Sequence, residues 1–223
     1  MNNTLTDMLE GVELVVFDFD GVIADSEVIS LQAMADALDD YGVQMDLDQV
    51  RHHYLGVSLA TIIQDLTTSR PNIDWTDFPE FWEQMVFARL RSGLKPVFRV
   101  DALLDHLHAS GTPFCIASSG SFQRIFLSLD TMNMRERFDH VFSADLVEHG
   151  KPAPDLFLHA AAQLGVAPDK CIVLEDSPKG VQGARAAGMR AVGFVGGRHL
   201  TGLEEAHGKV LRDAGANAVI TSY

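Results

Sequence analysis

The sequence predicts an α/β protein built on a parallel sheet, with helices on both faces of the sheet and one inserted helical domain. Three observations predict this class. Short apolar runs with strand character recur along the chain, helical patterns alternate with them from residue 100 onward, and helical patterns alone fill residues 24–94. Strands that alternate with helices form parallel sheets covered on both faces, so the core is expected to be Rossmann-like.

The predicted strands are short runs rich in Val, Ile, Leu and Phe, as expected for strands that are buried on both faces. They span residues 13–20, 113–119, 140–145, 171–177, 190–196 and 217–222. Apolar residues at helical spacing predict the helices that connect the later strands. These helices span residues 100–110, 121–132, 155–165, 179–188 and 203–215.

The interval after the first strand predicts a separate helical domain. Its helical patterns cover residues 27–42, 47–56, 58–69 and 77–93. Asp77 and Glu80 have the spacing of a capping box at the start of the last helix, and the aromatic residues that follow are expected to form the insert's own core. We therefore expect a core domain of residues 1–23 and 95–223, interrupted by a helical domain of residues 24–94.

Composition and charge exclude several classes of protein. With 223 residues, 47% of them hydrophobic, the chain can bury one substantial core and a small second domain. Its net charge of -14 disfavours nucleic acid and anionic membranes as partners. The first residues lack a basic and apolar leader pattern, so a cytoplasmic location is expected. No long exposed apolar face is evident, which favours a monomer, and both cysteines lie in strand-like runs, which favours buried free thiols.

The first strand ends in two acidic residues, Asp18 and Asp20, with Phe19 between them. Because side chains alternate along a strand, both carboxylates would leave the backbone on the same side and repel each other. A bound cation would relieve this repulsion. Alternatively, one carboxylate caps the following turn and the other is solvated, because Asp-Gly pairs favour turns. This stretch alone leaves both interpretations open.

Polar residues also follow the other predicted strands. In an open parallel sheet the carboxyl ends of the strands form the ligand site, so these residues are expected to converge. They are Asp18, Asp20, Ser118, Ser119, Gly120, Lys151, Glu175 and Asp176. Acidic groups, a hydroxyl and an ammonium at one edge would suit a metal ion and a phosphate. Taken singly, Ser118 could be a turn hydroxyl, Lys151 a solvated charge, and the segment after Glu175 a helix start capped by Ser177.

Four motifs in chain order, "DFDGV", "ASSGS", "GKPAPD" and "LEDS", with a helical insert after the first, resemble those of the haloacid dehalogenase superfamily. The branch that the chain resembles most contains sugar-phosphate phosphatases and β-phosphoglucomutases with a helical cap. The resemblance extends from about residue 12 to the end of the chain. It implies an Mg²⁺-dependent enzyme that acts on a small phosphorylated metabolite, such as a sugar or sugar-acid monophosphate.

The resemblance also implies a role for each motif residue. Asp18 would be the nucleophile that forms an aspartyl-phosphate, and Asp20 would protonate the leaving group and then activate water. Mg²⁺ would be held by the Asp18 carboxylate, the Asp20 backbone carbonyl and Asp176, with Glu175 contacting it directly or through water. The phosphate would be bound by Ser118, Ser119, Gly120 and Lys151.

Three other activities known in the superfamily can be compared with these residues. Dehalogenases lack the second aspartate, whereas this chain has Asp20. Phosphonoacetaldehyde hydrolases use a lysine of the cap, whereas the first lysine here is Lys95. β-Phosphoglucomutases share the Gly-Val-Ser segment but carry cations beside it, where this chain has Leu55 and Leu59.

The loss of those cations favours hydrolysis over transfer of phosphate between two sites on a sugar. The mutases also carry a histidine where this chain has Ser30. Arg51 or His52 could replace the missing cations, so the mutase remains an alternative. In the cap, Glu27, Arg51 and Ser58 are candidate substrate contacts. A remote alternative is a phospho-receiver domain, which also uses Asp, Mg²⁺ and Lys but has no helical insert.

Overall fold

The computed structural model describes residues 3–223. Residues 1 and 2, which begin the N-terminal segment where no leader pattern was found, lie outside the described residues. The chain forms two compact units. The α/β unit comprises Met1–Asp25 and Lys95–Tyr223, and the helical unit comprises Ser26–Leu94. The divisions fall after Asp25 and Leu94, next to the predicted boundaries after residues 23 and 94.

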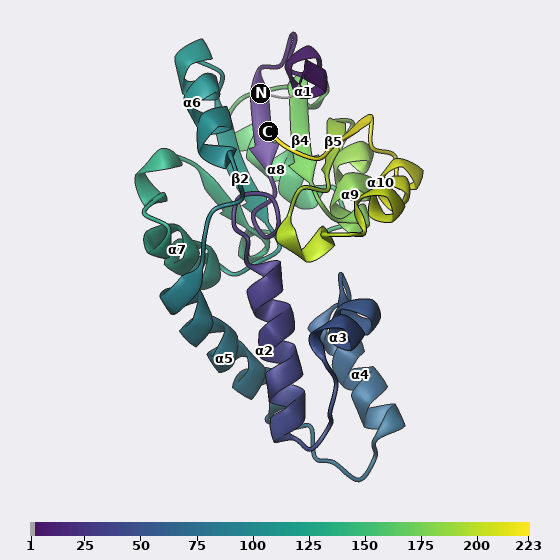
Figure 1. Ribbon diagram of the computed structural model, residues 1–223. Coiled ribbons are helices and arrows are strands. Elements are labelled where there is room, and N and C mark those ends of the chain that lie inside the picture. Colours follow the sequence, from purple (N-terminus) through teal and green to yellow (C-terminus); the bar gives the residue numbers. More distant parts are fainter. Residues whose placement is uncertain (1–2) are drawn as a thin grey trace. The chain divides into compact units, whose positions relative to one another are not determined.

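A six-stranded parallel sheet forms the centre of the α/β unit (Figure 1). The strands are β1 (Leu14–Phe17), β2 (Phe114–Ser118), β3 (Val141–Ser143), β4 (Cys171–Glu175), β5 (Arg190–Phe194) and β6 (Ala218–Ile220). Their spatial order is β3-β2-β1-β4-β5-β6, and every neighbouring pair is parallel. The α/β class and the six predicted strands are thereby confirmed, each strand being shorter than its apolar run.

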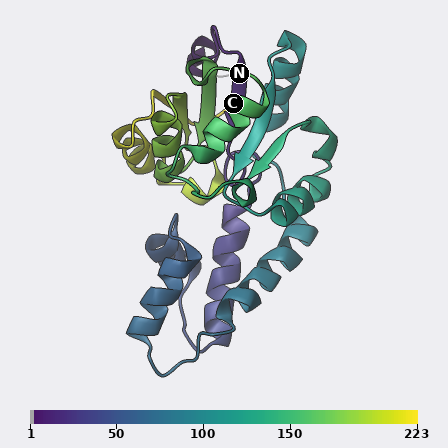
Figure 2. The ribbon, with the colours of Figure 1, turned by 180° about the vertical axis from the view of Figure 1, so that it is seen from behind.

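Helices connect the strands, as the alternating pattern predicts. They are α6 (Val100–Ser110), α7 (Phe122–Thr131), α8 (Asp155–Gln163), α9 (Pro178–Ala186) and α10 (Glu204–Asp213). A further short helix, α1 (Asn3–Met8), precedes β1 and has no counterpart among the predicted elements. Helix α8 packs against β1, β2 and β3, and it lies behind the strands in Figure 1 and in front of them in Figure 2. Helix α9 packs against β4 and β5.

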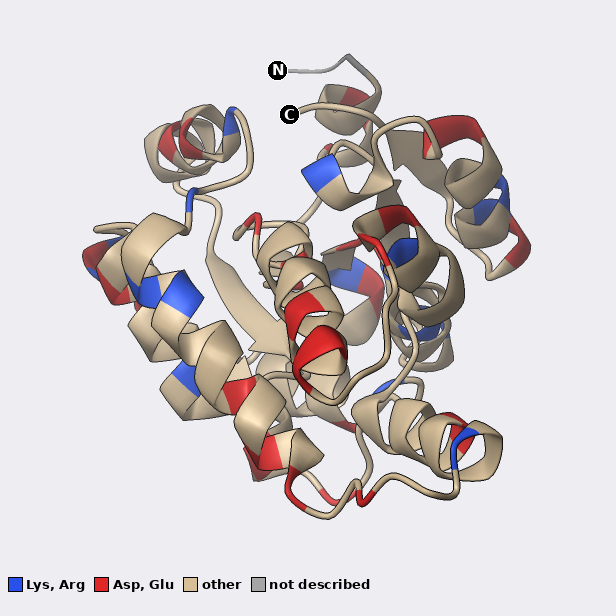
Figure 3. Ribbon diagram, turned by 60° about the horizontal axis from the view of Figure 1, so that its bottom comes forward, with Lys and Arg blue, Asp and Glu red and all other residues tan. Residues whose placement is uncertain are grey.

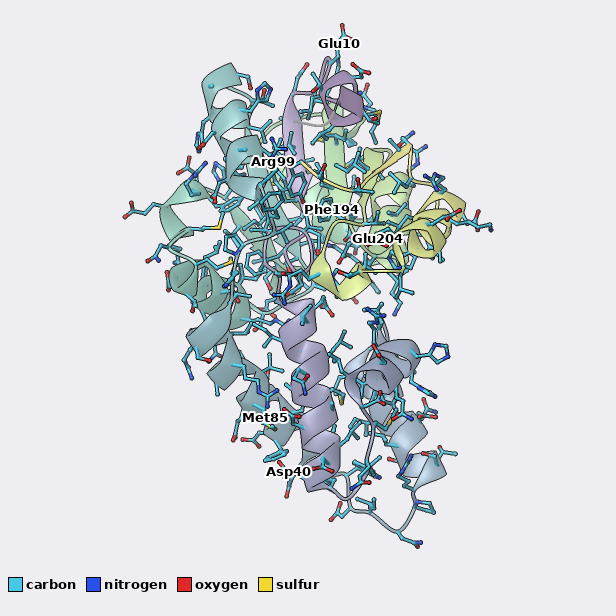
Figure 4. The ribbon with its side chains drawn as sticks, in the orientation of Figure 1. Glu10, Asp40, Met85, Arg99, Phe194 and Glu204 are labelled. Atoms are coloured by element: carbon cyan, nitrogen blue, oxygen red, sulfur yellow. The ribbon has the colours of Figure 1, made fainter. Side chains whose placement is uncertain are left out.

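The runs of apolar residues in the central strands explain why the middle of the sheet is buried on both faces. All four residues of β1 and all five of β4 are buried, and these residues are apolar without alternation except Glu175, the last residue of β4. Phe194 of β5, labelled in Figure 4, stacks on Tyr223 with ring centroids 4.5 Å apart. The Tyr223 hydroxyl donates to the Val22 carbonyl at 2.8 Å, which ties the end of the chain to the loop after β1. Cys115 and Cys171 are buried free thiols, as predicted.

The helical unit has a core of its own. Its helices are α2 (Glu27–Asp40), α3 (Leu47–Tyr54), α4 (Leu59–Ser69) and α5 (Phe78–Gly93). Tyr41, Trp75 and Phe78 form an aromatic cluster, in which Tyr41 stacks on Trp75 at 5.5 Å and meets Phe78 edge-on at 5.1 Å. Leu38 and Leu66 are fully buried beside it. Phe78 belongs to this core, and Phe81 and Trp82 pack against it, so the packing role predicted for the aromatic residues of α5 is confirmed.

The predicted capping box at Asp77 and Glu80 is wrong. Asp77 has φ -92° and ψ -5°, and its side chain makes no cap hydrogen bond, because a capping side chain normally requires an extended backbone at that position. The Glu80 carboxylate instead accepts a bond from Gln84 on its own helix. A capping box does form at α3, where Asp46 and Gln49 each accept from the other's backbone amide.

Charged residues lie on most elements, with Lys and Arg interspersed among the more numerous Asp and Glu (Figure 3). Among the described residues, every helix is too short or too polar to cross a bilayer.

Packing of α10 on the sheet gives a test of the fold. Leu211 is fully buried and fills the space above Gly193 of β5, where an added Cβ would lie 2.8 Å from its Cδ1. Leu211→Ala is expected to lower the free energy of unfolding by about 2–5 kcal/mol, because it leaves a cavity. The neighbouring Val210 is 45% exposed, so Val210→Ala should change that energy by at most about 0.5 kcal/mol. Urea denaturation of both variants measures the difference, and equal effects would contradict the packing described.

Candidate active site

The site is built where the central strands end. Asp18 directly follows β1, and its amide donates to the Leu174 carbonyl at 2.9 Å, so that β1–β4 pairing continues to this residue. A tight loop follows, in which Gly21 has φ +78° and donates to the Ala24 carbonyl at 2.7 Å. The amides of Ile23 and Ala24 both donate to the Phe19 carbonyl at 2.9 Å. Asp18 is therefore held on a fixed backbone.

Three buried carboxylates converge at this edge. One carboxylate oxygen each from Asp18, Glu175 and Asp176 lies within 4.8 Å of the others. The Lys151 ammonium joins the cluster, donating to Asp18 Oδ1 at 2.5 Å, to Glu175 Oε1 at 2.7 Å and to the Ala117 carbonyl at 2.9 Å. Its side chain is only 4% exposed. The structure thus brings together four of the residues that the sequence predicts for this site.

The carboxylates of this cluster are buried and outnumber its one ammonium group, and this shifts the pKa values of Asp18 and Asp176. Burial, assisted by the carboxylates of Glu175 and Asp176, raises the pKa of Asp18 well above its usual range, against the opposing effect of Lys151. Burial and the Glu175 carboxylate raise the pKa of Asp176 in the same way. For Lys151, burial alone would lower the pKa, but the charges of Asp18 and Glu175 outweigh it and the pKa is raised. Lys151 therefore stays charged, but its single positive charge does not offset the burial and mutual repulsion of the Asp18 and Asp176 carboxylates.

The donor set fits a hard divalent cation. If all are ionised, the three carboxylates carry three negative charges and Lys151 supplies one positive charge, leaving a formal excess of two. Mg²⁺ prefers oxygen ligands and is usually held by one or two carboxylates together with water and substrate phosphate. Asp18 and Asp176 suit this role, and the positive charge of a bound cation would oppose the effects of burial and carboxylate repulsion that raise their pKa values.

Glu175 is the most constrained member of the cluster. Its Oε1 accepts from Lys151, and its Oε2 accepts from the amide and hydroxyl of Ser177, both at 2.9 Å. Ser177 caps α9, its hydroxyl accepting from the Gly180 amide at 3.0 Å, and Pro178 is the first helical residue. Ser177 therefore connects the acidic motif to the start of α9, because it bonds both to Glu175 and to the Gly180 amide.

The loop after β2 places Ser118, Ser119 and Gly120 before α7, which begins at Phe122. Ser118 is 1% exposed, and its hydroxyl oxygen accepts from the Gly120 amide at 3.0 Å. The Ser143 hydroxyl donates to the Gly120 carbonyl at 2.7 Å, which anchors the loop to the end of β3. In this structure the Gly120 amide therefore points at Ser118. The roles of all three residues toward phosphate remain predictions.

Asp20 has a partner that the sequence motifs do not indicate. Arg124 of α7 donates to Asp20 Oδ1 at 2.9 Å, and both side chains are 18% exposed. A Cβ at Gly120 would lie 3.6 Å from Asp20 Oδ2 and 3.4 Å from the Ser118 hydroxyl, so both groups lie near this loop. Sequence reasoning missed Arg124, although its position in the first turn of the helix after a Ser-Ser-Gly segment was an available signal.

His199 is the second residue that sequence reasoning missed. Its Nε2 lies 3.1 Å from Asp176 Oδ2, and its side chain is 3% exposed. The signal was the segment "GGRHL" directly after the fifth apolar run, because residues at that position reach the same edge of the sheet.

The candidate substrate contacts lie in the helical unit. Glu27 is the first residue of α2, Arg51 lies on α3 with Asp48 3.9 Å away, and Ser58 caps α4 by accepting from the Thr61 amide. Ser58 and Thr61 also share a hydroxyl hydrogen bond at 2.8 Å. The role of these three residues remains a prediction.

The geometry of Glu175 gives a direct test. A Cβ at Gly180 would lie 1.7 Å from Glu175 Oε1 and 2.5 Å from Oε2, so Gly180→Ala must displace the carboxylate from Lys151. The free energy of unfolding should fall by about 1–3 kcal/mol, although alanine favours a helix. Gly150→Ala, where the added Cβ meets open space, is the control and should change it by at most about 0.5 kcal/mol. Equal unfolding midpoints in urea would contradict this arrangement.

Several known proteins are similar to this chain over most of its length. The sequence model of the family described as haloacid dehalogenase-like hydrolase matches residues 15–194. A 6-phosphogluconate phosphatase of Escherichia coli (strain K12) is 30% identical over 190 residues, covering 84% of this chain and 85% of that protein. A fructose-1-phosphate phosphatase of the same organism is 33% identical over 186 residues, covering 83% of this chain and 97% of that protein.

A solved structure of a haloacid dehalogenase-like protein from Agrobacterium tumefaciens superimposes with a TM-score of 0.83 at 35% identity, covering 94% of this chain and 93% of that one. The family match extends over most of the chain, and it includes the residues after β1, β2 and β4 and Lys151 in the loop after β3. The chain belongs to the haloacid dehalogenase-like hydrolase family.

Proposed function

We propose that this protein is an Mg²⁺-dependent phosphatase that hydrolyses a sugar or sugar-acid monophosphate through an aspartyl-phosphate on Asp18. The chain is a phosphoric monoester hydrolase, given its family and the phosphatases among its relatives. The proposal adds the metal, the intermediate and the substrate class. The observation that carries it is the buried Asp18 carboxylate, held by Lys151 beside Glu175 and Asp176.

Asp18 would act as the nucleophile. Its backbone is fixed by the β1–β4 pairing, and Lys151 orients its carboxylate through Oδ1. A carboxylate that attacks an anionic phosphate must approach like charge, so the positive groups beside it decide the barrier. Lys151 supplies one such charge, and its contact with Glu175 keeps the ammonium at that position.

Mg²⁺ would be held by the carboxylates of Asp18 and Asp176 and by the Asp20 carbonyl. Glu175, whose two oxygens already accept three bonds from protein groups, suits a ligand water better than direct contact. When bound, the cation would neutralise charge on the phosphate and on the attacking carboxylate.

Asp20 would move the protons. As a general acid it would protonate the departing alkoxide, and as a base it would activate the water that hydrolyses the aspartyl-phosphate. The bond from Arg124 to Oδ1 orients this carboxylate at the loop that carries Ser118 and Gly120. Ser118, Ser119 and Gly120 would bind the phosphate oxygens there, the Gly120 amide turning from the Ser118 hydroxyl toward the phosphate.

The substrate class follows from two considerations. The relatives named above act on 6-phosphogluconate and fructose 1-phosphate, both small phosphorylated carbohydrates. A phosphohexomutase must also bind a second phosphate group, and this chain has Leu55 and Leu59 where the mutases carry cations beside Gly-Val-Ser. Both points support hydrolysis of a monophosphate.

Steady-state phosphate release tests the proposal. The wild-type enzyme should release phosphate from a panel of sugar and sugar-acid phosphates only when Mg²⁺ is present, and EDTA should abolish release. Asp18→Asn should lower kcat by at least about 10³-fold, because it removes the nucleophile. The exposed Asp213 offers a control, and Asp213→Asn should leave kcat unchanged. Full activity of Asp18→Asn would contradict the intermediate. Interconversion of sugar phosphates with a bisphosphate primer, without release, would favour the mutase.

Substrate choice gives a second test. We propose that Glu27, Arg51 and Ser58 of the helical unit select the substrate, with Arg51 binding anionic groups. Arg51→Ala should change the ratio of kcat/KM values for 6-phosphogluconate and fructose 1-phosphate by about 10-fold or more, because a charge-assisted hydrogen bond is lost. Arg91→Ala, at an exposed position of α5, is the control. An unchanged ratio in Arg51→Ala would show that Arg51 does not select the substrate.

A further inference from the structure

We propose that His199 is a positioning residue, which fixes the orientation of the Asp176 carboxylate and thereby sets the affinity of the site for Mg²⁺. This inference rests on the proposed function, in which Asp176 holds the metal. His199 lies in a short 3₁₀ helix, Arg198–Leu200, that follows β5. Its Nε2 is 3.1 Å from Asp176 Oδ2, and the two side chains are 3% and 10% exposed.

The chemistry of the imidazole and the carboxylate determines which of the two donates the hydrogen bond between His199 and Asp176. An ionised carboxylate has only acceptors, so a hydrogen bond across the 3.1 Å contact would have the imidazole donating through an Nε2–H to Oδ2 of Asp176. A buried charge-assisted bond of this kind restricts the rotation of the carboxylate. Asp176 then presents its oxygens to Asp18 and Glu175 in one orientation before any cation arrives.

Two glycines leave the space that the imidazole and the carboxylate occupy. A Cβ at Gly197 would lie 2.6 Å from Cε1 and 2.7 Å from Nδ1 of His199. A Cβ at Gly21 would lie 1.9 Å from Asp176 Oδ2 and 2.8 Å from His199 Cε1. Gly21 also has φ +78°, but Gly197 has φ -67° and ψ 143°, which any residue adopts. The glycine at 197 is therefore explained by space for the ring and not by backbone conformation.

A second histidine holds the main chain of the same residue. His207 of α10 donates through Nε2 to the Asp176 carbonyl at 2.6 Å. The Asp176 carboxylate therefore contacts His199, and the Asp176 backbone carbonyl accepts from His207. The two histidines lie on elements that follow β5 in the sequence. Outer partners that orient a ligating carboxylate typically contribute 10–100-fold to metal affinity.

A purely space-filling role for His199 makes a different prediction from a positioning role. Glutamine can place an N–H donor near the position of the imidazole Nε2, whereas phenylalanine keeps a ring and removes the donor. If the ring only fills space, His199→Phe should resemble the wild type more closely than His199→Gln does. If the hydrogen bond matters, the order should be reversed.

Calorimetric titration of metal-free, full-length protein with MgCl₂ and no substrate is the deciding experiment. His199→Phe should weaken Mg²⁺ binding about 10–100-fold, and His199→Gln should restore most of that loss. Gly197→Ala, which keeps both side chains but intrudes on the ring, should weaken binding in the same direction and carries the test if His199→Phe does not fold. The exposed His140 offers a control, and His140→Phe should bind Mg²⁺ as the wild type does.

Activity assays then separate the outcomes. In His199→Phe, the Mg²⁺ concentration for half-maximal phosphate release should rise, while the KM for substrate at saturating Mg²⁺ should stay within about twofold of wild type. Unchanged Mg²⁺ affinity in both His199→Phe and Gly197→Ala, with an active wild type, would overturn the role of His199 alone. A wild type that binds no Mg²⁺ and releases no phosphate would overturn the proposed function and this inference together.

Discussion

The contact of the Lys151 ammonium with the Asp18 and Glu175 carboxylates is the constraint on which the α/β unit depends. These side chains are almost completely removed from water, and an unpaired buried charge costs several kcal/mol. Lys151 satisfies all three of its hydrogen-bond donors with Asp18, Glu175 and Ala117, each near the carboxyl end of a different strand. One side chain therefore links β1, β2 and β4 at the edge of the sheet that we propose carries the catalytic site.

Glycines and caps around this cluster are consequences of the same constraint. Gly180 leaves room for Glu175, Gly21 leaves room for Asp176, and Ser177 joins Glu175 to the start of α9. Each of these local features would have a structural explanation in isolation. Together they hold the three carboxylates of Asp18, Glu175 and Asp176 close to one another at the edge of the sheet, an arrangement that suits a cation.

Much of this could be predicted from the sequence, because it rests on patterns of short range. Apolar runs predicted the strands and helical spacing predicted the connecting helices. The ends of these runs and the loops that follow them predicted Asp18, Lys151, Glu175 and Asp176. The chain order of the four motifs then indicated the family. These features depend on local chemistry and on the topology of a parallel sheet, so one sequence suffices to find them.

The remaining features depend on side-chain directions that sequence spacing does not determine. Arg124 reaches Asp20 from across 104 positions, and His199 reaches Asp176 from an element that follows the last expected motif. Asp77 has a capping sequence but a helical backbone and forms no box, whereas Asp46 at the start of α3 has an extended backbone and does form one. The Gly120 amide donates to the Ser118 hydroxyl of its own loop, a direction that the Ser-Ser-Gly spacing does not specify.

The central claim is that Asp18 forms a covalent phosphoenzyme, and trapping that species tests it most directly. Asp20→Asn removes the base that would activate water, and p-nitrophenyl phosphate has a leaving group that needs little protonation. Rapid mixing with Mg²⁺, acid quenching and mass spectrometry should then show one phosphoryl group per chain, located on Asp18. Release of p-nitrophenol with no phosphorylated protein at any time point would mean that water attacks phosphorus directly, and would contradict the account.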